Sequence, residues 1–183
     1  MGHNFNLLHS GGLDHRAYTD HTGLMGNPLY HDDIGAMCFN AAKTWQIGWY
    51  DDRKATVDPL DGAWTGKIIG VADYMKNSLF PVVVKIDTGS TIGQLYIAFN
   101  RAQGINKDNV QADDQVTIVE TNGSGDNASQ SFLKAHLAEG QQYAVENWNG
   151  SGKTLTVKAT AIHLSRSSEI RDRKSTRLNS SHP

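Results

Sequence analysis

The sequence predicts an α+β fold in which a short helical segment precedes a larger β-rich region. Between residues 64 and 162, short runs rich in Val, Ile, Thr and Tyr alternate with turn residues, a pattern typical of strands. Long helical patterns do not separate these runs, so we expect a mainly antiparallel, β-sandwich-like domain. The chain has 183 residues, enough for one domain and a second small one.

The N-terminal stretch places two histidines where the chain is expected to reverse direction. His3 and His9 are six residues apart, which is the wrong spacing for partners on one face of a continuous helix. Asn6 lies between them, and Asn tolerates the left-handed conformation that ends a helix in a sharp turn. We therefore expect a helical turn, a reversal at Asn6, and convergence of the two imidazoles as half of a metal site.

This stretch resembles the end of the metzincin zinc motif, H-E-x-x-H-x-x-G-x-x-H. The resemblance makes His3 and His9 the second and third zinc ligands, with Asn6 in the place of the Gly. The first His and the general-base Glu would then stand immediately before Met1. We therefore expect an N-terminally truncated fragment that holds no catalytic residue of its own.

Metzincins share a second feature, a tight turn whose Met lies beneath the metal-binding imidazoles. Met25, between Leu24 and Gly26, matches such a Met-turn. A thioether is an adaptable apolar group that can pack under the rings without binding the metal. The resemblance therefore assigns Met25 a structural role in the site.

A short helix is expected directly after this region. Asn40 is a good N-cap, Ala41, Ala42 and Trp45 share a helical spacing, and Gly48 would end the helix. The order of these features, H-N-x-x-x-x-H-S, G-L-M-G and C-F-N-A-A-K-x-W-Q-I-G-W-Y, resembles the gametolysin family of metzincin peptidases.

Four segments follow from these patterns. Residues 1–52 would be the C-terminal part of a metzincin-like catalytic domain, and residues 53–62 a polar connector. Residues 63–165 would form the β-sandwich-like domain, and residues 166–183 have the composition of a disordered tail. The tail resembles translated sequencing-adapter read-through and is excluded from functional reasoning. The expected strands are Trp64–Val71, Pro81–Ile86, Leu95–Phe99, Gln115–Glu120, Gln142–Asn147 and Thr154–Ile162, and 131–137 could be a strand or helical turns.

Composition excludes several classes of function. The formal net charge of −2 argues against a general nucleic-acid or membrane-surface binder, and no apolar run is long enough to cross a bilayer. The single cysteine, Cys38, allows no internal disulfide. Asp113, Asp114 and Asp126 lack a defined calcium-binding spacing, and His136 and His163 are isolated. Sequons at Asn122, Asn127 and Asn149 suit a secreted glycoprotein, although their residues are also common in turns.

The resemblance implies a secreted zinc endopeptidase that acts on extracellular-matrix or cell-wall glycoproteins. Three imidazoles would hold Zn²⁺ and the Glu would act as general base. Since this chain supplies two zinc ligands and lacks the general-base Glu of the motif, we expect it to bind zinc weakly and not to hydrolyse peptides. The alternative is a non-enzymatic β-sandwich module that binds glycan or matrix protein, with the histidines incidental.

Overall fold

A computed structural model describes residues 2–26, 35–76, 79–89, 93–123 and 129–164. The described residues form an α+β fold, as predicted, with a six-stranded sheet in the order β1-β6-β5-β4-β3-β2 and a separate pair, β7-β8. The strands are β1 Ser10–Gly11, β2 Lys54–Val57, β3 Val83–Ile86, β4 Leu95–Asn100, β5 Gln115–Thr121, β6 Ser131–Leu137, β7 Gln142–Val145 and β8 Leu155–Lys158. The helices are α1 Ala41–Ile47 and the 3₁₀ segments η1 Gly2–Phe5, η2 Leu24–Gly26, η3 Asp51–Arg53, η4 Val71–Lys76, η5 Gly104–Asn106 and η6 Trp148–Gly150.

The centre of the large sheet is antiparallel, from β3 through β6. Each edge is closed by a short parallel strand, β1 beside β6 and β2 beside β3. Parallel partners need long connections between them. The edge strands therefore tie the N-terminal region and the segment after α1 to the same sheet as the later strands.

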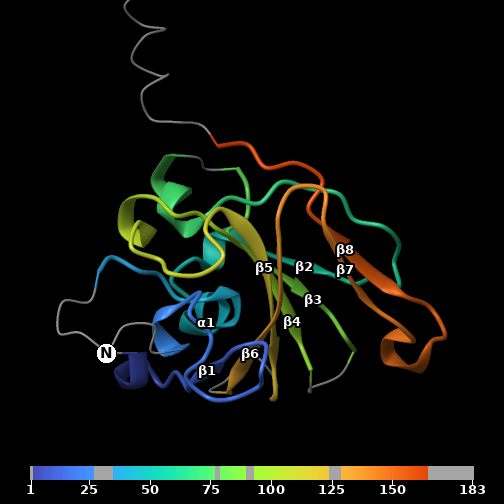
Figure 1. The fold of residues 1–183 in the computed structure, drawn as a ribbon. Helices are drawn as coiled ribbons and strands as arrows, with labels where there is room; N and C mark the ends of the chain where they lie inside the picture. The colour runs from blue at the N-terminus through green and yellow to red at the C-terminus, as the bar shows by residue number, and fades with distance from the viewer. Residues whose placement is uncertain (1, 27–34, 77–78, 90–92, 124–128, 165–183) are drawn as a thin grey trace, which may run out of the picture.

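Helix α1 and the β7-β8 hairpin cover opposite faces of the sheet (Figure 1). Successive side chains of a strand point to opposite faces, so neighbouring Leu95 and Tyr96 belong to different hydrophobic clusters. Ala41 and Ala42 of α1 pack with Tyr96 on one face. The hairpin packs on the other face, so the second layer is a two-stranded ribbon rather than a full sheet.

Helix α1 begins and ends where the sequence predicts. The side chain of Asn40 accepts a hydrogen bond from the Lys43 amide at 3.0 Å, and Gly48 adopts a left-handed conformation with φ of 73°. Ala41 and Ala42 are fully buried, and the Trp45 ring packs on Tyr96 with centroids 5.7 Å apart. The small alanines allow the helix to approach the sheet closely.

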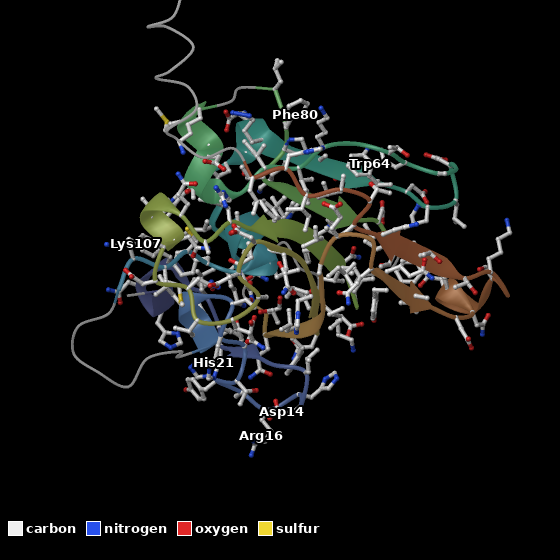
Figure 2. The ribbon with its side chains drawn as sticks, turned by 45° about the horizontal axis from the view of Figure 1, so that its top comes forward. Asp14, Arg16, His21, Trp64, Phe80 and Lys107 are labelled. Carbon is white, nitrogen blue, oxygen red and sulfur yellow. The ribbon has the colours of Figure 1, made fainter. Side chains whose placement is uncertain are left out.

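Two elements differ from the predicted ones, and a third, left open by the sequence, is decided by the structure. The polar segment 53–62 contributes β2, because Lys54–Val57 pairs in parallel with β3. The expected strand Trp64–Val71 does not form; residues 64–70 have no regular structure, and η4 begins at Val71. Residues 131–137, for which strand and helix were both open, form β6. Trp64 lies at the end of the molecule opposite Asp14 (Figure 2).

Candidate metal centre

The N-terminal residues form the predicted turn. A 3₁₀ helix spans Gly2–Phe5, and Asn6 ends it with φ of 59°. The Asn6 amide donates to the His3 carbonyl at 3.0 Å, and the Leu7 amide donates to the Gly2 carbonyl at 3.3 Å. The left-handed residue turns the chain back, and Leu7, which is 2% exposed, anchors the return in the interior.

The turn brings His3 and His9 into contact. Their Nε2 atoms lie 3.1 Å apart, and their ring centroids are separated by 4.8 Å with an interplanar angle of 74°. The Nδ1 atom of His3 lies 2.8 Å from the Leu7 carbonyl oxygen. Because a carbonyl only accepts, Nδ1 of His3 carries a hydrogen, and Nε2 of the neutral ring presents its lone pair toward His9.

This arrangement fits two ligands of one zinc ion. Two nitrogens bound to tetrahedral zinc at about 2.0–2.1 Å lie roughly 3.3 Å apart, close to the separation of the two Nε2 atoms. The bond from His3 to the Leu7 carbonyl is the kind of outer contact that fixes the tautomer of a metal-binding imidazole. Within the described ranges, however, no group of three or more His, Cys, Asp or Glu side chains is arranged to hold a metal ion.

Met25 lies beneath the turn that carries His3. It is 7% exposed within η2, and a Cβ atom built on Gly2 would fall 2.1 Å from its Sδ atom. A Cβ on Gly26 would fall 1.6 Å from the Asp20 carbonyl oxygen, so this turn also needs a glycine. The thioether therefore packs under the residue next to His3 and supports the site from below.

The electrostatic environment favours a neutral imidazole at His9. Partial burial, then the neighbouring His3, then the Lys43 ammonium lower the pKa of His9. A neutral imidazole is the form that binds a metal. The surroundings of His9 therefore reduce the competition between protons and a metal ion for its lone pair.

Tyr18 joins the histidine pair, although no sequence pattern predicts this contact. Its hydroxyl oxygen lies 2.7 Å from His9 Nε2, and the two ring centroids are 4.0 Å apart. Tyr18 belongs to the polar loop after β1, where its spacing from His9 matches no zinc motif. Only the fold of that loop reveals the contact.

A buried polar cluster lies behind the site and was also missed. The Asn40 amide nitrogen donates to Asp20 Oδ2 at 2.6 Å, to Ser10 Oγ at 3.2 Å and to Ser131 Oγ at 3.1 Å. The other Asp20 oxygen accepts from the Thr22 hydroxyl at 2.6 Å. Burial raises the pKa of Asp20, while the hydrogen bonds from Thr22 and Asn40 act in the opposite direction.

Several other residues singled out in the sequence do not join the site. Asp114 pairs with Arg101 at 2.7 Å, and the Asp113 carboxylate accepts from Asn109 at 2.6 Å. His136 bonds to Gln115 at 2.6 Å on the sheet, and His163 is exposed. Asp126, Asn127 and the tail 166–183 lie outside the described residues.

Comparison of the chain with protein-family models, with curated proteins and with solved structures found no match. In the described part of the chain, no helix is both long enough and apolar enough to cross a membrane.

Proposed function

We propose that this chain is part of a zinc-dependent endopeptidase of the metzincin type, resembling the gametolysin family. The observation that carries the proposal is the approach of the His3 and His9 Nε2 atoms to 3.1 Å, in a turn whose Gly2 packs on the buried Met25. The spacing of the histidines and the metzincin resemblance predict these three residues as parts of one site. Two imidazoles in contact, with an apolar methionine packed against the residue before His3, support a metal centre more strongly than either histidine alone.

In this proposal His3 and His9 hold the zinc ion through Nε2, and the Leu7 carbonyl keeps the His3 ring in its orientation. Bound zinc would acidify a water molecule and polarise a peptide carbonyl. A third imidazole and a general-base Glu complete such a centre, and the resemblance expects them N-terminal to His3. The chain by itself is therefore expected to lack peptidase activity.

The substrate class and the location of the protein come from the resemblance. Gametolysin-like peptidases are secreted and cut glycoproteins of the extracellular matrix or cell wall. Two of the sequon asparagines, Asn122 and Asn149, are exposed, so their positions are compatible with glycosylation. We therefore propose a secreted peptidase with a protein or glycoprotein substrate.

The first test is the nucleotide sequence upstream of the Met1 codon. Codons for His-Glu immediately before Met1 would place His3 and His9 in a complete zinc motif. Any other sequence, or a start codon in use at Met1, would contradict the peptidase assignment. A non-enzymatic β-rich module that binds glycan or matrix protein would then become the function to assay.

The second test is metal binding by the purified chain. Titration with Co²⁺, a spectroscopic substitute for Zn²⁺, should give visible absorption that His3→Ala and His9→Ala each remove. His15→Ala is the matched control, because His15 stacks on Phe132, with ring centroids 5.5 Å apart, instead of joining the pair. Absorption that survives both substitutions would place the metal elsewhere.

A further inference from the structure

We propose that the Tyr18 hydroxyl is a third metal-binding group of this chain, so that His3, His9 and Tyr18 form a two-imidazole, one-phenol site. The inference rests on the proposed metal centre and adds a ligand to it. It changes what is expected of the chain, since three protein ligands hold an ion that two hold only weakly.

The other two donor atoms both lie close to His9 Nε2. The Tyr18 hydroxyl oxygen lies 2.7 Å from this atom and His3 Nε2 lies 3.1 Å from it. Neighbouring ligand atoms of a small divalent ion are roughly 3 Å apart, as follows from metal–ligand bonds of about 2 Å. The Tyr18 ring packs on the His9 ring, with centroids 4.0 Å apart and an interplanar angle of 40°.

The hydrogen-bonding capacity of the three groups is poorly matched without a cation. In the neutral form of His3, Nε2 is a lone-pair acceptor, because Nδ1 of the same ring donates to the Leu7 carbonyl. If His9 Nε2 accepts from the Tyr18 hydroxyl, its lone pair faces the lone pair of His3. If His9 Nε2 carries a hydrogen, that single hydrogen must be shared between His3 and Tyr18. A metal ion bound by all three atoms removes the mismatch, and the phenol proton passes to solvent.

The backbone holds Tyr18 in an uncommon conformation, in which its hydroxyl contacts His9. Its φ is 70°, a left-handed value that a bulky residue rarely adopts. The amides of Tyr18 and Asp20 both donate to the Ser10 carbonyl, at 3.1 Å and 3.4 Å. These bonds attach the loop directly to β1, which begins one residue after His9.

A carboxylate organises the rest of this loop. Asp14 accepts from the Thr19 hydroxyl at 2.5 Å and from the Arg16 guanidinium at 2.7 Å. These hydrogen bonds, Thr19 first, lower the pKa of Asp14 to about 2. Asp14 and Arg16 stand at the outer tip of the loop (Figure 2), so the contacts that shape it are separate from the proposed donor atoms.

Titration of the full chain with Cu²⁺ and Co²⁺ tests the proposal. Copper bound to a phenolate gives a visible charge-transfer band that imidazole ligands alone do not give. We expect the wild-type chain to show this band and Tyr18→Phe to lose it, with Co²⁺ affinity reduced roughly tenfold or more, since loss of even an outer-sphere contact costs about 10–100-fold. The Phe ring keeps the packing against His9, so the fold should survive, and circular dichroism checks this.

Tyr74→Phe is the matched control, because the Tyr74 hydroxyl donates to Asp52, with distances of 3.0 and 3.2 Å to its two oxygens. This variant should keep both the band and the affinity. If Tyr18→Phe binds Co²⁺ as the wild type does while His9→Ala does not, the phenol is no ligand and the histidine centre still stands. If the wild-type chain binds neither ion through His9, the two-imidazole centre and the inference are both wrong.

Discussion

The Sδ atom of Met25 lies so close to Gly2 that a Cβ atom on Gly2 would fall 2.1 Å from it. A separation this short is a clash, so the methionine can pack beneath the histidine turn only because position 2 has no side chain. The contact joins two segments that the sequence marked independently, the His3 turn and the Met25 turn. The absence of a side chain at Gly2, the residue before His3, is therefore needed for the packing of the proposed metal centre.

Gly2→Ala should therefore destabilise the fold by about 1–3 kcal/mol, the usual cost of forcing an extra methyl group into a packed site. Urea unfolding measures the change. In a double-mutant cycle, Met25→Ala should cost less in the Gly2→Ala background than alone, because the shortened side chain makes room for the methyl group. Additive costs would show that the two residues do not meet.

The left-handed conformation of Asn6 predicts opposite results for two small substitutions. Its φ is 59°, so Asn6→Gly should leave stability within about 0.5 kcal/mol, whereas Asn6→Ala should cost about 1–2 kcal/mol. Asn6→Gly should also bind Co²⁺ more tightly than Asn6→Ala, because the turn sets the distance between His3 and His9. Equal behaviour of the two variants would mean that the turn does not control the pair.

Asn40→Asp separates helix capping from the buried polar cluster. Asp caps helices as well as Asn does, so capping alone predicts little change. The Asn40 amide nitrogen, however, donates to buried Asp20 at 2.6 Å, and the substitution would place two carboxylates together. We expect a loss of about 2–4 kcal/mol at pH 7 in urea unfolding.

The loss caused by Asn40→Asp should shrink on acidification, since one shared proton restores a donor between the two carboxyl groups. Asn40→Ser supplies the comparison, because a serine keeps a capping oxygen and brings no charge. A pH-independent loss of the same size in both variants would assign the effect to the missing amide donor of Asn40 and not to a second buried carboxylate.

The Lys43 side chain should make the free energy of unfolding depend on pH in the alkaline range. Burial lowers its pKa from 10.5 to about 8, with Asp20 acting in the opposite direction, and its ammonium group donates to the Ser129 carbonyl and to Gln46. Between pH 8 and pH 10.5 the unfolded chain holds this proton more firmly than the folded chain. Stability should therefore rise with pH through that window, by about 1 kcal/mol from pH 7 to 9.

Thermal unfolding at both pH values measures the effect, which corresponds to roughly 2–4 °C for a chain of this size. Lys43→Met should remove this pH-dependent contribution, whatever its own effect on stability. Lys107→Met is the control at an exposed lysine, labelled in Figure 2. The interpretation is wrong if the Lys43→Met curve keeps the wild-type slope.

Local signals in the sequence predicted local structure well. The cap at Asn40, the left-handed Gly48 and the turn at Asn6 depend on the conformational preferences of single residues, and all three appear where expected. Strands β3, β4, β5, β7 and β8 lie within or overlap the predicted runs, because alternation and β-branched residues mark a half-buried strand.

The errors arose where pairing partners decide the structure. Lys54–Val57 is polar enough to suggest a connector, yet it becomes β2 because the edge of β3 offers backbone partners. Trp64–Val71 has a strand-like composition but gains no strand pairing. Ser10–Gly11 is too short to predict and is a strand only through its contact with β6.

From the sequence alone, spacing and the conformational preference of Asn predicted the contact of the two histidines and the turn between them, and the resemblance to metzincins singled out the methionine of the second turn. Tertiary structure alone decided that Tyr18 lies 2.7 Å from His9, that Gly2 meets Met25, and that α1 packs with strands from the β-rich region. These contacts join segments whose separation along the chain says nothing about distance. They depend on which surfaces bury together, and that is settled by the packing of the whole chain.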